Sequence, residues 1–466
     1  MIKILKFGGT SVGSADAVRR ATRIVKDVAA PRCVVVSATA GTTDRLAQAA
    51  DAAERGDGAA ARGHVVDLRA RHARLAEELD ATAIVRELEG LAEATDALLD
   101  AIALLQECTA RSRDAIWAYG ERASSLIVAA ALEQLGVRST AVDGAGVLIT
   151  DEVFGNASPL VERTREAARQ RISAILGEGR TPVVTGFIGS TADGVVTTLG
   201  RGGSDYSAAI LAAALDAEEL LIYTDVSGVM SADPRIVAGA KPLPSLSYAE
   251  AAELSYFGAK VIHPRTVLPA IEAGIPVRIL NTFAPNDPGT TITRATPRDG
   301  SVVKATTSLG GLALVTVAGA GMSGVPGFAA RVFDTTAAEQ VSVLMISQSS
   351  SENSICFVVP AETGERLKHA LERMLARELA RHDVERVTVE APIAIVAAVG
   401  EGMRGTPGVA ARVFGALGKA GVNVVAIAQG SSELNISLCV GEREREAAVR
   451  AIHEEFHSEG DGLSMS

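Results

Sequence analysis

Two short segments combine glycines with charged side chains in a way that suits phosphate binding. The segment 197–209 reads TTLGRGGSDYSAA and places Arg201 between glycines, directly before an Ala-rich run that predicts a helix. Glycines allow close backbone approach to a ligand, and a helix N-terminus beside a guanidinium binds anions. An ordinary strand-to-helix turn capped by Ser204 fits the glycines equally well. Because Arg201 and Asp205 also lie within the turn, an anion site is as well supported as that alternative.

Lys6 is the second candidate, because its position in the first predicted strand points it inward. In IKILKF, Ile4 and Lys6 share one strand face. Burying an ammonium costs several kcal/mol unless an anion compensates it, and the candidate anions are a phosphate and Asp205. A lysine that extends to solvent from a strand end is the alternative. The glycines that follow, Gly8 and Gly9, favour phosphate.

Three other polar segments could contribute to a site. YTDVSGVMSADPR (223–235) follows a predicted strand and fits the base, ribose and phosphates of a nucleotide, although it could equally be a polar turn. In YGERASS, Glu121 lies in a helical context and could meet a substrate amine, or could be an exposed helix glutamate. FGAKVIHP supplies Lys260, which is either a phosphate contact or a surface charge.

The elements that position these residues predict an α/β fold. The first 40 residues give a strand, a glycine turn, a helix over about 14–28 and a buried strand, which is a βαβ opening that favours a parallel sheet. Residues 45–113 are rich in Ala, Glu and Arg and predict a helical insertion. Apolar strands return at 181–188, 219–225 and 275–280. Residues 1–295 are therefore predicted as one domain, and NTFAPNDPGTTIT (281–293) as the linker that leaves it.

Beyond residue 300 the sequence repeats itself. The 39 residues from Gly321 align without a gap to those from Gly402, with 19 identities at a constant offset of 81. Each copy predicts a strand, a Gly/Pro turn, a helix of about 10 residues and two strands joined by a polar turn. Two copies of one small module follow, at 296–390 and 391–466, and repetition alone leaves open whether they do anything beyond structure.

Composition narrows the class of protein. The 466 residues carry a formal net charge of −11, which argues against nucleic acid or an anionic membrane as the main partner. No apolar run approaches the ~20 residues of a membrane helix, and the chain opens directly on a strand rather than a signal peptide, so we expect a cytoplasmic protein. The four cysteines have no metal-type spacing and are predicted to be reduced and structural.

The motifs together resemble those of aspartate kinases in the amino acid kinase superfamily. KFGGTSV, SATAGTTD, GE, GFIG, TTLGRGGSDYSAA, YTDVSGVMSADPR and FGAKVIHP occur in that family's order, and two tandem ACT modules after the kinase domain are also typical of it. The resemblance covers nearly the whole chain. It implies an amino acid kinase fold, with a parallel-rich sheet between helices, followed by two ferredoxin-like βαββαβ ACT modules.

The activity implied is transfer of the ATP γ-phosphoryl group to the β-carboxylate of L-aspartate, the first step of lysine, threonine and methionine biosynthesis. Mg²⁺ would be carried on the ATP phosphates, with no direct protein ligands predicted. The implied catalytic residues are Lys6, Asp205, Gly8 and Gly9. The implied aspartate pocket is Ser37, Thr43, Glu121, Phe187, Arg201 and Ser204. The implied nucleotide contacts are Lys6, Thr10, Ser11, Thr224, Asp225, Met230, Arg235, Lys260 and Val261.

Control by an aspartate-family amino acid is expected from the repeats. Gln348 and Gln429 are equivalent positions at the ends of apolar strands, and Gly327, Phe328 and Gly408 lie on the facing turns. An amide both donates and accepts, which suits an amino acid ligand, although the glutamines could merely tie adjacent strands together. The turn segments resemble those of bifunctional aspartokinase and homoserine dehydrogenases, which places threonine before lysine as effector. The sequence ends at 466 without a dehydrogenase domain, which leaves the effector open. A homodimer through the ACT modules is expected.

Three alternatives remain at the level of sequence. A related kinase acting on glutamate, acetylglutamate, carbamate or UMP would share the phosphate machinery, but would need neither the pair Glu121 and Arg201 nor the repeats. A sensor without turnover would be expected to have lost Lys6 or Asp205, and both are present. A dinucleotide oxidoreductase would place GxGxxG after the first strand, and GGTSVG does not supply it.

Overall fold

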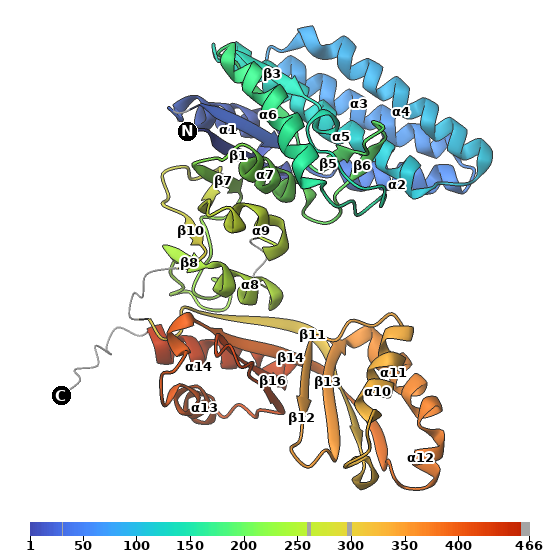
Figure 1. Ribbon diagram of the computed structural model, residues 1–466, viewed down its shortest axis with the longest axis vertical. Helices are drawn as coiled ribbons and strands as arrows, with labels where there is room; N and C mark the ends of the chain where they lie inside the picture. The colour runs from blue at the N-terminus through green and yellow to red at the C-terminus, as the bar shows by residue number, and fades with distance from the viewer. Residues whose placement is uncertain (30, 259–261, 296–300, 458–466) are drawn as a thin grey trace, which may run out of the picture. The chain divides into compact units, whose positions relative to one another are not determined.

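The chain forms two compact units in a computed structural model that describes residues 1–29, 31–258, 262–295 and 301–457 (Figure 1). Two segments of the region predicted as the catalytic domain, 230–241 and 249–260, cluster with the second unit. Unit 1 comprises Met1–Val229, Pro242–Tyr248 and Val261–Thr296, and unit 2 comprises Met230–Lys241, Ala249–Lys260 and Pro297–Ser466.

The described part of unit 1 is built on an eight-stranded, parallel-rich sheet. Its strands are β1 (Lys3–Phe7), β2 (Arg32–Val36), β3 (Ser139–Val142), β4 (Thr181–Thr185), β7 (Glu219–Thr224), β8 (Ser245–Ser247), β9 (Val277–Asn281) and β10 (Thr290–Thr293). They lie in the order β3-β4-β2-β1-β7-β9-β10-β8, and only β9 and β10 pair antiparallel among the described neighbours. The predicted parallel-rich α/β fold is confirmed.

The expectation for the segment before residue 295 was partly wrong. The segment 281–293 was predicted as a linker, but its last four residues form β10 within the sheet. The Pro, Gly and Asn residues of the segment do make the turn out of β9. The run of β-branched Thr290, Thr291, Ile292 and Thr293 carried the strand signal, and Ile292 is fully buried.

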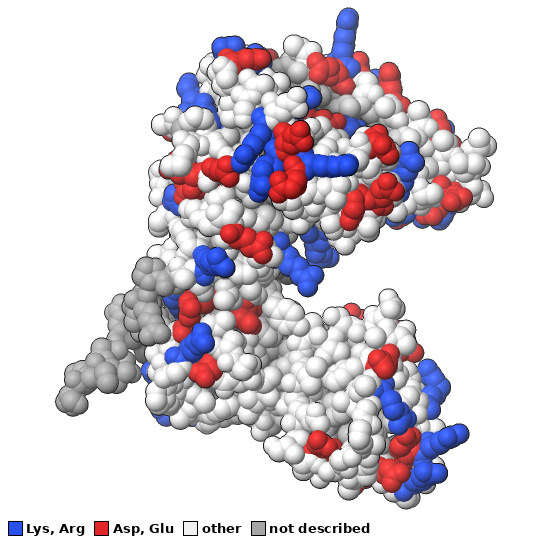
Figure 2. Space-filling model, in the orientation of Figure 1, with Lys and Arg blue, Asp and Glu red and all other residues white. Residues whose placement is uncertain are grey.

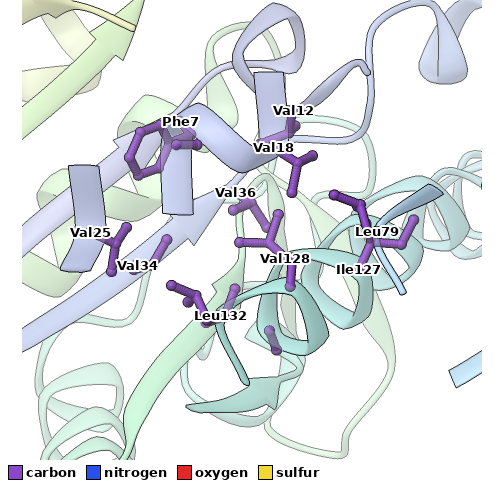
Figure 3. Close-up of a cluster of buried hydrophobic side chains, with 14 of the residues drawn as sticks. Phe7, Val12, Val18, Val25, Val34, Val36, Leu79, Ile127, Val128 and Leu132 are labelled. Carbon is purple, nitrogen blue, oxygen red and sulfur yellow. The ribbon is translucent and has the colours of Figure 1, made fainter. Parts of the chain in front are cut away.

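Helices cover both faces of the sheet, and strand parity decides which side chain meets which helix. Leu5 and Phe7 of β1 pack with α1 (Ala15–Asp27) and α5 (Ala110–Gln134) in one apolar core (Figure 3). On the other face, β1 contacts α7 (Gly203–Ala214), which packs against α6 (Val161–Gly177) and α9 (Pro264–Glu272). Lys6 has the parity of Ile4 and therefore belongs to the α7 face.

The predicted helical insertion is confirmed. It consists of α2 (Thr42–Glu54), α3 (Gly58–Glu78) and α4 (Val85–Leu105), which pack on one another and on the start of α5, as the blue helices of Figure 1 show. Asp57 caps α3 by accepting from the Ala60 N–H, and Thr109 caps α5 by accepting from the Ser112 N–H. Beside α5, β5 (Ile188–Ser190) and β6 (Val196–Thr198) form a short antiparallel pair.

Unit 2 contains the two copies of the repeat, and their strands form one six-stranded sheet in its described residues. The helices are α8 (Tyr248–Tyr256), α10 (Phe328–Ala338), α11 (Ala361–Met374), α12 (Ala376–Ala380), α13 (Val409–Lys419) and α14 (Arg445–His457). The strands are β11 (Ala305–Ala318), β12 (Met345–Gln348), β13 (Ser354–Pro360), β14 (Arg386–Val399), β15 (Ala426–Ala428) and β16 (Asn435–Gly441). The order is β12-β13-β11-β14-β16-β15, which confirms the predicted repeat of strand, helix and two strands.

The two modules share their long strands. The second half of β11, from Leu314 to Ala318, pairs with the start of β14, whereas its first half, from Ala305 to Leu309, pairs with the end of β14. The sheet of the second module therefore includes a strand segment from the N-terminal end of the first module. The repeat alignment begins at Gly321, after β11 has ended at Ala318. It therefore gave no signal for this exchange.

On the face drawn in Figure 2, acidic and basic side chains are intermixed on each unit. No helix within the described ranges combines the length and the apolar character that crossing a bilayer requires.

Candidate functional site: a cavity at the glycine turns

Lys6 and Asp205 form a buried ion pair at the centre of the site. Lys6 is 8% exposed, and its Nζ lies 2.7 Å from Oδ1 of Asp205, in the first turn of α7. The inward parity of Lys6 and its predicted anion partner are both confirmed. The alternative that Lys6 extends to solvent is wrong, because the strand end is closed over by α7.

The turn before α7 is built by glycines in the left-handed region. Gly200 and Gly202 each have a φ of 73°, which side-chain-bearing residues rarely adopt. Gly203 has no room for a Cβ, which would lie 2.5 Å from the Phe187 ring. Gly202 is the N-cap of α7 and no side chain caps the helix, so the alternative of a capping Ser204 is wrong. The turn leaves Arg201 exposed, and no partner is recorded for its guanidinium among the described residues.

A cavity of about 730 Å³ brings these residues together with others from distant parts of unit 1. The glycine turn after β1 and the loop between β2 and α2 meet here, because the carboxyl ends of parallel strands share one sheet edge. The glycine turn before α7 completes the cavity. The lining residues are Lys6, Gly9, Ser37, Ala38, Thr39, Ala40, Gly41, Thr43, Asp44, Trp117, Glu121, Gly155, Phe187, Gly200, Arg201, Gly202, Gly203, Ser204 and Asp205. All six residues predicted for the aspartate pocket are among them.

Glu121 is buried in this cavity, so the alternative of an exposed helix glutamate is wrong. It lies on α5 and is 3% exposed. Burial raises the pKa of its carboxyl to about 8, although the Ala38 N–H and the charge of Lys6 act in the opposite direction. Such a carboxyl holds a proton near neutral pH and releases it when a cation binds beside it.

Several predicted nucleotide contacts lie outside the cavity lining. Thr10 is exposed, while Ser11 is fully buried and its hydroxyl lies 2.7 Å from that of Thr282. The Ser11 side chain therefore ties the first glycine turn to β9. Thr224, at the end of β7, donates to the Asp225 carboxylate at 3.2 Å.

The remaining predicted nucleotide contacts fall elsewhere. Gly8, predicted as catalytic, also lies off the cavity lining, and its N–H donates to the Tyr223 carbonyl at 3.2 Å. Met230 and Arg235 belong to unit 2, where the exposed Arg235 guanidinium pairs with the Asp233 carboxylate at 2.6 Å. Lys260 and Val261 lie outside the described residues.

A second cavity, of about 440 Å³, lies in the first module of unit 2. It brings together Gly327, Phe328 and Gln348, as the repeat predicted, and adds Glu352. Gly327 is the left-handed N-cap of α10, and Gly408 has the same role in α13. Neither Gln348 nor its counterpart Gln429 makes a recorded side-chain hydrogen bond within the described residues, which counts against the alternative that they tie strands together.

Comparisons with known proteins agree with this geometry. The profile of the amino acid kinase family matches residues 1–281, and that of the ACT domain matches 315–375 and 396–456. Aspartokinase 3, chloroplastic, of Arabidopsis thaliana is 34% identical over 474 residues, covering 97% of this chain and 81% of that protein. The chain belongs to the amino acid kinase family. Its relatives within that family are aspartokinases.

Other members of the family extend the comparison. Bifunctional aspartokinase/homoserine dehydrogenase 1, chloroplastic, of the same plant is 38% identical over 463 residues, and this chain spans 50% of its length. The chain thus spans about half the length of the bifunctional relatives it matches. The crystal structure of E. coli aspartokinase III with lysine and aspartate superposes with a TM-score of 0.82 at 34% identity, covering 98% of this chain and 99% of that one. The predicted amino acid kinase and ACT folds are confirmed.

Some lining residues of this aspartokinase homologue were not predicted. Trp117, the single tryptophan of the chain, lies on the cavity wall with its ring centroid 6.0 Å from that of Phe187. A tryptophan one helical turn before Glu121 was a usable signal, because residues three and four apart share a helix face. Gly155 also lines the cavity, held by its N–H donating to the buried Asp114 carboxylate at 2.9 Å. That pairing spans 41 residues of sequence and had no local signal.

Proposed function

We propose that this chain is an aspartate kinase, which transfers the γ-phosphoryl group of ATP to the β-carboxylate of L-aspartate to give 4-phospho-L-aspartate and ADP. The observation that carries the proposal is the single cavity that holds Lys6, Glu121 and Arg201. One carboxyl and one guanidinium match the α-ammonium and α-carboxylate of an amino acid, and the lysine is left for the transferred phosphoryl group. Aspartokinase relatives covering most of this chain support the assignment.

The chemistry asks mainly for positioning and charge neutralisation. The β-carboxylate of aspartate has a reference pKa of about 3.9, so it is ionised at pH 7 and needs no general base. The obstacle is repulsion between this carboxylate and the phosphate. Lys6 and the glycine-turn amides oppose that repulsion at the reacting atoms, and Asp205 holds the Lys6 ammonium in place.

The other cavity residues shape the acceptor site in this proposal. Ser37, Thr43, Ser204 and the Phe187 ring enclose the aspartate carbon chain and its carboxylates. MgATP is the donor, with Mg²⁺ carried on the phosphates, and Asp205 would orient Lys6 or the metal. Thr10, Ser11, Thr224, Asp225, Met230, Arg235, Lys260 and Val261 remain the proposed nucleotide contacts. The product would feed lysine, threonine and methionine synthesis in the cytoplasm.

A coupled ADP-release assay tests the proposed substrate. L-Aspartate should support turnover, while L-glutamate, N-acetylglutamate, carbamate and UMP should not. Arg201→Lys and Glu121→Gln should raise KM for aspartate far more than KM for ATP, because each contacts only the acceptor. An equal rise in both KM values would move these residues to the nucleotide side and reopen the choice of acceptor.

We further propose that an amino acid effector binds the module cavity between Gln348 and the turn of Gly327 and Phe328. The Gln348 amide is available to a ligand that needs both a donor and an acceptor, and the turn glycine brings backbone close to the same space. Threonine is the proposed effector, from the resemblance of the turn segments to bifunctional enzymes, and lysine the alternative. The solved E. coli aspartokinase III holds lysine.

Effector titration separates these outcomes. Threonine and lysine are titrated against the wild type, Gln348→Ala and Gln429→Ala at fixed aspartate. A raised half-inhibition concentration in Gln348→Ala supports the first-module cavity, and the same effect in Gln429→Ala assigns a second site. Inhibition that neither substitution changes would place the effector site elsewhere. If neither amino acid inhibits the wild type, the modules do not sense these effectors.

A homodimer through the ACT modules is the proposed assembly. The sheet of unit 2 has two edge strands, β12 and β15, which carry Ile346 and Ile427 at equivalent positions of the repeat. These side chains are 50% and 45% exposed, which is high for isoleucine on a strand. Sedimentation of the wild type should give a dimer, and Ile346→Lys should shift it towards monomer. A wild-type monomer would contradict the proposal.

A further inference from the structure

The loop between β2 and α2 forms a large share of the cavity wall. Ser37, Ala38, Thr39, Ala40 and Gly41 of this loop line the cavity, together with Thr43 and Asp44 in the first turn of α2. The Ser37 N–H donates to the Phe7 carbonyl and the Ala40 N–H to the Gly9 carbonyl, both at 3.1 Å, so the first glycine turn holds one side of the loop. The small side chains leave its other side to be held by what lies behind it. Behind it lies a buried polar network that the sequence analysis did not predict.

Four side chains of this network form a continuous hydrogen-bonded row. The Thr42 and Thr39 hydroxyl oxygens are 2.7 Å apart, Thr39 Oγ1 lies 2.9 Å from His72 Nε2, and His72 Nδ1 lies 3.1 Å from the Tyr119 hydroxyl. All four residues are at most 2% exposed. Arg71 donates from Nη2 to both threonine hydroxyls. The row therefore connects the loop to α3 and to α5.

The row can run in two directions. A guanidinium only donates, so both threonine oxygens accept from Arg71. In one direction the Thr39 hydroxyl donates to His72 Nε2 and the Nδ1–H donates to the Tyr119 oxygen; in the other the Tyr119 hydroxyl donates to Nδ1 and the Nε2–H donates to Thr39, so in each case one ring nitrogen donates and the other accepts. Burial, aided by the charge of Arg71, lowers the pKa of His72 to about 3, so the ring stays neutral at physiological pH. A neutral imidazole is the form that either direction requires.

The row meets the acceptor site through three consecutive residues of α5. Tyr119 ends the row, Gly120 packs against the loop, and Glu121 faces the cavity. A Cβ on Gly120 would lie 2.8 Å from Thr42 Cγ2 and 2.9 Å from Ala38 Cβ, so the loop touches the helix there. The Ala38 N–H also reaches the Glu121 carboxyl. A shift of the loop would therefore change the surroundings of Glu121 directly.

We propose that His72 and Tyr119 are positioning residues for the acceptor: they hold the segment of residues 37–44 against α5 and so keep Ala38 and Glu121 aligned for the substrate's α-ammonium. The inference rests on the proposed function for the identity of that substrate. Because His72 lies on α3, the helical insertion would contribute to substrate binding as well as to packing. Neither residue touches the substrate.

The test removes single hydroxyls and keeps side-chain shape. Tyr119→Phe and Thr39→Val should each raise KM for aspartate about tenfold, the scale of one net hydrogen bond of ~1.4 kcal/mol, with kcat and KM for ATP changed less than about twofold. Thr39→Ser keeps the hydroxyl and should return KM to within about twofold of the wild type. Because the residues act in one row, the double variant Tyr119→Phe/Thr39→Val should be no worse than either single variant by more than a small factor.

A matched control separates positioning from stability. Thr95→Val removes an equally buried threonine hydroxyl from α4, where it donates only to the Leu91 carbonyl of its own helix. It should lower the melting temperature without changing KM for aspartate. If Tyr119→Phe and Thr39→Val behave like this control, the row is only structural and the proposal is wrong. Effects on KM that simply add in the double variant would also contradict it.

A readout that needs no turnover keeps this test separate from the proposed function. Trp117 is the single tryptophan and lies on the cavity wall, so its fluorescence reports on the cavity in the free protein. Acrylamide should quench it more strongly in Tyr119→Phe than in the wild type or Thr95→Val. Unchanged quenching would show that the loop does not depend on the row. Absence of aspartate turnover in the wild type would instead contradict the proposed function.

Discussion

Lys6 and Glu121 are both buried in one cavity, but only one of them has an ion-pair partner there. The Lys6 ammonium lies 2.7 Å from the Asp205 carboxylate before any phosphate binds, which holds it in place. Glu121 forms no ion pair with the residues that the structure describes, and burial raises its pKa to about 8. A substrate ammonium would supply the missing positive charge.

Replacing Lys6 should affect catalysis far more than substrate binding. Lys6→Met removes the only lysine on the cavity lining among the described residues, and kcat should fall by about 10³-fold or more, because the charge acts on the transferred group. Lys3→Met is the matched control on the same strand, since Lys3 pairs with Glu219 at 3.2 Å outside this cavity. Circular dichroism checks that both variants fold. A loss of less than about tenfold, ~1.4 kcal/mol of barrier, would refute the assigned role of Lys6.

The raised pKa of Glu121 predicts a pH-dependent KM for aspartate. Below about pH 8 the carboxyl holds a proton that the substrate ammonium must displace, so KM should fall as pH rises from 6 to 8 and level out above. Because the folded pKa lies above the unfolded one, the free energy of unfolding of the free protein should fall over the range from about 4.5 to 8. Both slopes should disappear in Glu121→Gln. A KM that is flat with pH in the wild type would contradict this account.

Strand parity and glycine turns could be predicted from the sequence, whereas contacts between helices and strands far apart in the chain could not. The parity of β1 predicted that Lys6 points inward, and the turn 200–203 predicted an anion-binding geometry before α7. The row from Thr42 to Tyr119 had no sequence signal, because His72 lies 33 residues from Thr39 and 47 from Tyr119. Hydrophobic periodicity and composition carry information about residues that are close in sequence. Contacts between residues this far apart can be seen only in the folded structure.

Helix α8 depends on one such contact. Glu250, fully buried on α8, lies 3.1 Å from the Lys304 ammonium just before β11 and accepts from the Glu401 N–H at 2.8 Å just after β14. Glu250→Ala removes a carboxylate that contacts both the buried Lys304 ammonium and the Glu401 N–H, and should lower the free energy of unfolding of unit 2 by about 2 kcal/mol or more. Glu446→Ala, which breaks an exposed pair with Arg450, should cost less than about 1 kcal/mol. Denaturant titrations compare the two, and equal small costs would contradict this contribution of α8.

At the scale of the whole molecule, the repeat gives unit 2 an internal symmetry that extends to single contacts. Glu352 accepts from the Gly324 N–H at 2.8 Å in the first module, and Glu433 accepts from the Gly405 N–H at 2.7 Å in the second. Both glutamates have a φ of 55°, so the two turns match at this position. The 81-residue offset predicted this equivalence, but the exchange of strands between modules lay outside the repeated segment.

Hydroxylamine trapping distinguishes transfer of the γ-phosphoryl group to the β-carboxylate of L-aspartate from transfer to any other acceptor. An acyl phosphate reacts with hydroxylamine to give a hydroxamate, which can be measured beside the ADP released in the same reaction. We expect β-aspartyl hydroxamate and ADP in equal amounts from the wild type, and neither above background from Lys6→Met. ADP release with aspartate but without hydroxamate, or hydroxamate formed instead from another acceptor of the panel, would contradict the proposed function.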